Sequence, residues 1–218
     1  MKYIIETNDL SKKIKIENIL DNINIRLEEG NIYGFVGRNG SGKSMLFKTI
    51  CGFVKPTEGE ILVNGVDIYK KNTFPDDTRA LIEKPKFLPH LTGFENLELL
   101  ASIQNKIGTK KIIESLEKVG LLAYKDKKFG AYSLGMKQKL GIAQVLMEDP
   151  KILLLDEPFN GLDEQSAKNI RKILLIEKEK GKLILIATHI KEDVEILCDE
   201  VFYLDVGKII NHKIINKN

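Results

Sequence analysis

Residues Gly37–Ser44 read Gly-Arg-Asn-Gly-Ser-Gly-Lys-Ser and fit the pattern G-x-x-x-x-G-K-[ST], in which Lys43 is the lysine. The apolar run 32–36 comes just before this segment and reads as a buried strand. The run 45–50 follows it and reads as a helix. A strand, a glycine-rich turn and a helix are the context that this motif requires, so the segment predicts a phosphate-binding loop.

The residue types of this loop suit a phosphate group. Unpaired N–H groups and the positive end of the dipole favour an anion at a helix start. A Cβ atom at Gly40 or Gly42 would crowd the approach of phosphate oxygens to the backbone. Lys43 supplies a charge for the β- and γ-phosphates, and the Ser44 hydroxyl can bind Mg²⁺. The alternative is a chance glycine-rich turn, which four matched positions in the right context disfavour. The predicted nucleotide-binding residues are Gly37, Arg38, Asn39, Gly40, Ser41, Gly42, Lys43, Ser44 and Met45.

The composition is that of a globular protein. The chain has 218 residues, of which 43% are hydrophobic and 30% charged, which suits one large α/β domain or a core with an inserted subdomain. The net charge is only +3 and the charges are interspersed, so we expect no direct nucleic-acid partner. Cys51 and Cys198 lie in no metal-binding or redox spacing, and we expect buried, reduced thiols. No secretory signal or membrane-length apolar run is evident, so we expect a cytoplasmic chain that does not cross a membrane itself.

The hydrophobic pattern predicts a mainly parallel sheet. The runs 152–156 and 183–187 are almost wholly apolar and are separated by a helical segment, as in strands that are buried on both faces. Short runs at 2–7 and 19–27 read as half-buried strands, and 201–210 reads as a closing hairpin.

A helical segment interrupts this α/β pattern. From residue 86 to residue 148 the apolar side chains recur at helical spacing. The predicted fold class is therefore α/β, a P-loop NTPase core with a mainly parallel sheet, an antiparallel β portion and an inserted helical subdomain. We expect a single domain over 1–218, in which 1–85 and 149–218 form the core and 86–148 the subdomain.

Two carboxylates follow the apolar run 152–155. Asp156 stands at the carboxyl end of a strand, the edge at which open α/β sheets bind ligands, and a carboxylate there can hold Mg²⁺. Glu157 comes next and can act as a general base on an attacking water. A solvated Asp-Glu pair is the alternative, and the phosphate loop in the same chain favours the functional interpretation.

Ser133 and His189 are weaker candidates. Ser133 and Gly135 open a helix, so the serine either caps that helix or belongs to a second anion site at its N-terminus. His189 ends the buried strand that follows the strand of Asp156. A lone histidine is more often structural, but at this strand end it can donate a hydrogen bond to a γ-phosphate oxygen.

The order of these motifs resembles that of the ATP-binding subunit of ABC transporters, over essentially the whole chain. The motifs are 37–44, 132–136, 152–157, Asn160-Gly161-Leu162-Asp163 and His189. In that family two subunits enclose two ATP molecules between them. The resemblance implies that Glu157 is the catalytic base, that His189 senses the γ-phosphate, and that Asp163 lies in the loop that links the two sites. It also implies that Ser133 and Gly135 touch the ATP of the partner.

The sequence departs from that family at three places. The family signature is Leu-Ser-Gly-Gly-Gln, whereas residues 132–136 read Tyr-Ser-Leu-Gly-Met. Glu83 occupies the position of the family glutamine, where its carboxylate would bind Mg²⁺ together with Ser44 and Asp156. The aromatic residue that stacks on adenine falls near Ile14, which offers apolar contact only. Residues 81–85 and 132–138 together resemble the bacitracin and lantibiotic export or immunity branch.

The resemblance implies an ATPase that binds ATP and Mg²⁺ as a homodimer and drives a separate transmembrane permease from the cytoplasmic face of the membrane. We expect a hydrophobic docking surface for the permease at Phe87, Leu88 and Phe94, with core packing as the alternative. The leading alternative function is a non-transport ABC ATPase that acts on nucleic acid or ribosomes. A regulatory module without turnover is disfavoured by Glu157, and a GTPase by the lack of an Asn-Lys-x-Asp motif in the sequence.

Overall fold

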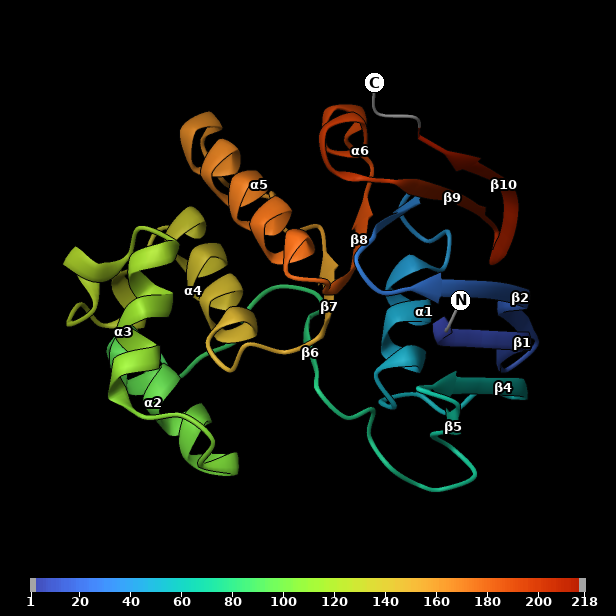
Figure 1. Cartoon of the computed structure of the whole chain (residues 1–218), viewed down its shortest axis with the longest axis horizontal. Helices are drawn as coiled ribbons and strands as arrows, with labels where there is room; N and C mark the ends of the chain where they lie inside the picture. Colours follow the sequence, from blue (N-terminus) through green and yellow to red (C-terminus); the bar gives the residue numbers. More distant parts are fainter. Residues whose placement is uncertain (1–2, 216–218) are drawn as a thin grey trace.

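The computed structural model describes residues 3–215, which form two sheets and several helices (Figure 1). The strands are β1 (Tyr3–Ile14), β2 (Glu17–Glu28), β3 (Ile32–Val36), β4 (Glu58–Val63), β5 (Val66–Asp67), β6 (Thr78–Leu81), β7 (Ile152–Asp156), β8 (Leu183–Thr188), β9 (Glu200–Asp205) and β10 (Lys208–Ile214). The helices are α1 (Lys43–Ile50), α2 (Gly93–Gln104), α3 (Thr109–Lys118), α4 (Leu134–Leu146), α5 (Glu164–Glu179) and α6 (Lys191–Leu197), with 3₁₀ turns at Leu122–Tyr124 and Phe129–Ala131.

The six-stranded sheet is mainly parallel, as predicted. Its order is β10-β9-β3-β8-β7-β6, and β9, β3, β8, β7 and β6 run parallel while β10 pairs antiparallel with β9. In β7, Leu154 packs toward α1 and the second sheet, whereas Leu153 and Leu155 pack toward α5 and α6. Both faces of the strand are covered, which explains its unbroken apolar sequence.

The second sheet is antiparallel and has the order β2-β1-β4-β5. Helix α1 lies between the two sheets, where Leu46, Phe47 and Ile50 are fully buried with side chains of both. The predicted strands 2–7 and 19–27 were too short, since β1 and β2 extend as a long hairpin. Their outer ends are polar and exposed, so they lack the alternating pattern from which the prediction was made.

Helices α2, α3 and α4 lie together at the side of the molecule opposite the antiparallel sheet (Figure 1). The predicted helical pattern at the start of this segment becomes α2, which begins at a capping box. The Thr92 hydroxyl accepts the Glu95 N–H, and the Glu95 carboxylate accepts the Thr92 N–H. Among residues 3–215, no helix is both long and apolar enough to cross a membrane.

Candidate functional site

The phosphate loop connects β3 to α1, as predicted. Gly40 and Gly42 have φ angles of +82° and +106°, a region that favours glycine. A Cβ atom at Gly42 would also come within 2.9 Å of the Ile19 carbonyl oxygen, whereas one at Gly40 would meet no protein atom within 4 Å. Within the protein, glycine is therefore favoured at position 40 by the backbone angle alone. A Cβ atom at Gly40 could crowd only a bound phosphate.

The start of α1 presents backbone donors to a cavity. The first intrahelical hydrogen bond runs from the Leu46 N–H to the Gly42 carbonyl at 2.9 Å, so the preceding N–H groups of the turn have no helical partner. Lys43 is buried, and its Nζ donates to the carbonyl oxygens of Gly37 at 2.6 Å and Arg38 at 3.1 Å. The cavity beside this turn has a volume of about 600 Å³, within the range of small-molecule sites. Together these features fit the phosphates of a nucleotide.

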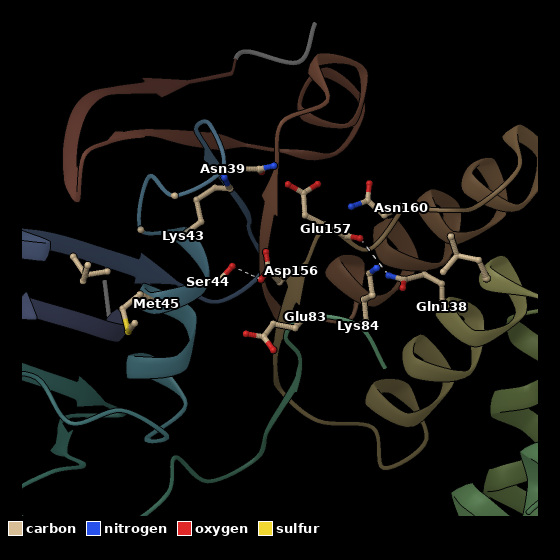
Figure 2. Close-up of a pocket in the computed structure, with 14 residues that line it drawn as sticks. Asn39, Lys43, Ser44, Met45, Glu83, Lys84, Gln138, Asp156, Glu157 and Asn160 are labelled. Carbon is tan, nitrogen blue, oxygen red and sulfur yellow. Dashed lines mark hydrogen bonds between the residues drawn. The ribbon is translucent and has the colours of Figure 1, made fainter. Parts of the chain in front are cut away.

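Asp156 meets Ser44 at the same cavity (Figure 2). The Ser44 hydroxyl donates to Asp156 Oδ2 at 2.5 Å, and Asp156 is only 6% exposed. Among the described residues, no group of three His, Cys, Asp or Glu side chains is placed to hold a metal ion by itself. Mg²⁺ usually takes one or two protein ligands and completes its shell with phosphate and water, so this hydroxyl–carboxylate pair fits it.

Glu157 and His189 come together next to Asp156. His189 Nδ1 lies 2.9 Å from Glu157 Oε1, because β7 and β8 are neighbours and end at the same edge. The glutamate side chain is 19% exposed and the histidine 55%. Glu157 has a φ of +49°, and its N–H donates to the Ala187 carbonyl at 2.9 Å, which turns the chain away from the sheet. Both candidates were predicted separately, and the structure adds their contact.

Gln138 supports this corner from α4, and the sequence analysis assigned it no role. It is 6% exposed, and its Nε2 donates to the carbonyl oxygens of Glu157 at 3.2 Å and Pro158 at 3.1 Å. The signal available in the sequence was a polar residue on a helix face that is otherwise apolar. Its partners, however, lie on a distant strand end.

Glu83 also lines the cavity, but its ion pair is with Lys48 of α1. Among the described residues, the neighbouring lysines Lys84 and Lys86 form no ion pair with Glu83. Lys84 instead lines the cavity, and Lys86 contributes charge from further away. The hydrogen bond from Lys48 lowers the pKa of Glu83. Glu83 has a φ of +64°, and its carboxylate lies at the edge of the cavity below Asp156 in Figure 2.

The adenine-side position at Ile14 stays a prediction. Ile14 ends β1 and is 45% exposed, whereas Ile19 of β2 lines the cavity. Ile14 pairs with Glu17 near the tip of the hairpin. Further lining residues to which the sequence assigned no individual role are Lys84, Leu134, Gln138 and Asn160.

Comparison with known proteins gives the family. A family model described as ABC transporter matches residues 20–160. The chain is 42% identical to the uncharacterized ABC transporter ATP-binding protein YybJ of Bacillus subtilis (strain 168), over 98% of this chain and 99% of that protein.

The chain belongs to the ABC transporter family. It is also 38% identical to the bacitracin transport ATP-binding protein BcrA of Enterococcus faecalis, over 96% of this chain and 69% of that protein. The solved structure of an ATP-binding subunit of an ABC transporter superposes with a TM-score of 0.88 at 28% identity, covering 97% of this chain and 90% of that one. The predicted resemblance is confirmed, and this ABC domain is an ATPase.

The signature segment of this ABC ATPase lies outside the cavity apart from Leu134. The Ser133 hydroxyl caps α4 by accepting the Met136 N–H at 3.2 Å, as one interpretation of the sequence required. Gly135 packs so closely on the loop before α5 that a Cβ atom would lie 2.9 Å from the Gly161 carbonyl oxygen. Asp163 caps α5 by accepting the Ser166 hydroxyl at 2.7 Å and the Ser166 N–H at 2.8 Å, and these hydrogen bonds lower its pKa. The start of α4 and the loop 160–163 therefore form one packed unit.

Proposed function

We propose that this chain is the motor subunit of an ABC transporter, which hydrolyses MgATP at a dimer interface and drives a separate membrane permease. The observation that carries the proposal is the convergence of Lys43, Ser44, Asp156 and Glu157 on one cavity of about 600 Å³. Binding donors, metal ligands and a candidate base are then within reach of one nucleotide.

The chain's own residues have distinct parts in this reaction. Lys43 and the backbone N–H groups of the loop bind the phosphates, and Ser44 and Asp156 would hold Mg²⁺, which supplies charge neutralisation when bound. Glu157 takes a proton from the attacking water. His189 contacts Glu157 through Nδ1, so Nε2 is the ring nitrogen left to face a phosphate oxygen.

We propose a homodimer because Ser133 and Gly135, two residues of the predicted site, do not line the chain's own cavity. Ser133 is exposed, and Gly135 lies beside the exposed Gly161, so both can meet the nucleotide of another copy. Asp163, which starts α5 from the same packed unit, would then lie between the two nucleotides.

The proposed permease surface lies at the start of the helical segment. Leu88 is 42% exposed, and Phe87 and Phe94 are half-buried, with Phe87 packed on Phe129 at 5.1 Å between ring centroids. An exposed aliphatic side chain beside two partly covered rings suits a groove for a permease helix. The similarity to a bacitracin transport protein supports an amphiphilic peptide as cargo. We propose that the chain lies on the cytoplasmic face of the membrane, bound to its permease.

The test is co-expression with any multi-span membrane protein that is found encoded beside this chain's gene. We expect the two to co-purify in detergent as a complex with two copies of this chain, and bacitracin to stimulate ATP hydrolysis in proteoliposomes. As a control, Leu88→Glu should weaken the complex while the isolated chain keeps its turnover. A chain that binds no membrane protein, and whose ATPase is stimulated by DNA or ribosomes in low salt, would support the non-transport alternative.

A further inference from the structure

A buried ion pair joins α5 to α6 outside the nucleotide cavity. Arg171 of α5 is 7% exposed and Asp193 of α6 is 1% exposed. The Nε and Nη2 atoms of Arg171 both donate to Asp193 Oδ1, at 2.9 and 2.6 Å, and Nη1 donates to the more exposed Glu192 at 3.1 Å. Burial raises the pKa of Asp193, and the arginine opposes that shift. Apolar side chains of α5 and α6 pack around the ion pair. Two apolar residues in place of Arg171 and Asp193 would hold the helices together with a smaller desolvation cost.

One end of this ion pair reaches the segment that carries His189. The Thr188 hydroxyl lies 3.4 Å from Asp193 Oδ2, and the same hydroxyl accepts the Ile190 N–H at 3.1 Å. In the sequence His189 lies between Thr188 and Ile190, and Asp193 lies in the first turn of α6, which follows. The ion pair thus fixes the backbone on both sides of the histidine.

The other face of the arginine reaches the segment that carries Glu157. The Arg171 guanidinium lies over the Phe159 ring, 5.4 Å from its centroid, and Phe159 is 6% exposed. Only Pro158 separates this phenylalanine from Glu157. One side chain therefore contacts both segments whose tips form the 2.9 Å contact between His189 and Glu157.

We propose that Arg171 is a positioning residue for ATP hydrolysis, which sets the contact between His189 and Glu157 by holding Asp193 on one side and Phe159 on the other. This inference rests on the proposed roles of Glu157 and His189. Asp163, the residue proposed to lie between two nucleotides, caps the start of the same helix. Helix α5 would therefore couple that position to the contact between His189 and Glu157. A displacement of that helix would move both segments together.

The experiment compares two buried ion pairs of the same helix. Arg171→Met removes the pair near the site. Lys182→Met removes the cation that pairs with Glu177 at the far end of α5, where the exposed fractions are 7% and 2%. Arg171→Lys keeps the charge but loses the forked donors and the planar contact with Phe159, and it replaces Arg171→Met if that variant does not fold. Each purified chain is assayed for kcat, for the Kd of a fluorescent ATP analogue and for its melting temperature.

We expect Arg171→Met to lower kcat by about 10- to 100-fold, because a shift of about 1 Å in reacting groups can cost that much. Its ATP Kd should change by less than about threefold, since the phosphate loop is untouched. Arg171→Lys should show the same loss in smaller degree. Lys182→Met should lower the melting temperature and leave kcat unchanged.

Three outcomes bear on the proposal. If Arg171→Met and Lys182→Met affect kcat alike, Arg171 acts through stability alone and the inference fails. If Arg171→Met costs as much in a His189→Ala background as in the wild type, measured in single turnovers, it does not act through His189 and the inference also fails. If Glu157→Gln and His189→Ala both retain full turnover, the proposed catalytic roles fail first and the inference with them.

Discussion

The two sides of the cavity are held in place by different means. On the phosphate-loop side, Lys43 donates to carbonyl groups five and six residues earlier in the chain. On the side that carries the proposed catalytic base, Glu157 contacts His189, which is 32 residues away, and Gln138 of α4 reaches the same corner. A local loop can be recognised as a motif, whereas a corner built by several elements depends on how those elements pack. The loop should therefore determine binding, and the corner should determine turnover.

The largest effect should come from breaking the loop. Lys43→Ala removes the charge beside the β- and γ-phosphates, so ATP binding and hydrolysis should fall by at least about 100-fold. Binding is measured with a fluorescent ATP analogue and turnover by phosphate release. Lys168→Ala, at an exposed helix position, is the control and should change neither. Unchanged affinity in Lys43→Ala would contradict the phosphate-loop assignment.

Glu157→Gln should separate the two sides of the cavity. The amide keeps the shape of the side chain and loses the base, so turnover should fall by about 100-fold or more while ATP still binds. Because hydrolysis would no longer open the dimer, ATP should trap it. Size-exclusion chromatography with MgATP should then show a dimer for the variant. A persistent monomer with wild-type turnover would remove Glu157 from the catalytic role.

Gln138→Leu should affect only the corner, and less strongly. It removes both hydrogen bonds to the carbonyl groups of Glu157 and Pro158, and leaving such groups unpaired costs about 1–3 kcal/mol of stability. We expect kcat to fall by about tenfold at an unchanged ATP Kd. Gln144→Leu, on the same helix, serves as the matched control. Equal kcat values in the two variants would show that Gln138 has a structural role only.

The smallest effect should arise at Glu83, where the two sides meet. Mg²⁺ favours the ionised carboxylate, whereas phosphate without metal repels it. Glu83→Gln should therefore raise metal-free ATP affinity by a few-fold, roughly 1 kcal/mol or less, and change Mg²⁺-bound affinity less. Lys48→Gln, which removes the partner charge, should shift metal-free affinity the other way. ATP is titrated with Mg²⁺ and with EDTA, and identical Mg²⁺ dependence in wild type and Glu83→Gln would place Glu83 outside the site.

Much of the fold was predictable because its signals repeat over short distances. The apolar runs of β7 and β8 indicated strands buried on both faces, and the loop motif indicated where a helix begins. The ends of β1 and β2 were not predictable in this way. Near Ile14 the hairpin is polar and exposed, so no burial pattern marked its length. That Ile19 lines the cavity was not predictable in this way either.

The sequence by itself determined the phosphate loop, the carboxylates at the end of β7 and the family. Each of these depends on residue types within a few positions of one another, which survive in any packing that keeps the local backbone. Only the tertiary structure decided that His189 contacts Glu157 and that Lys48 pairs with Glu83. It also decided that Arg171 contacts both Asp193, near His189, and Phe159, near Glu157. Those contacts join side chains far apart in sequence, and they exist only because the sheet brings β7 beside β8 and α5 packs against α6.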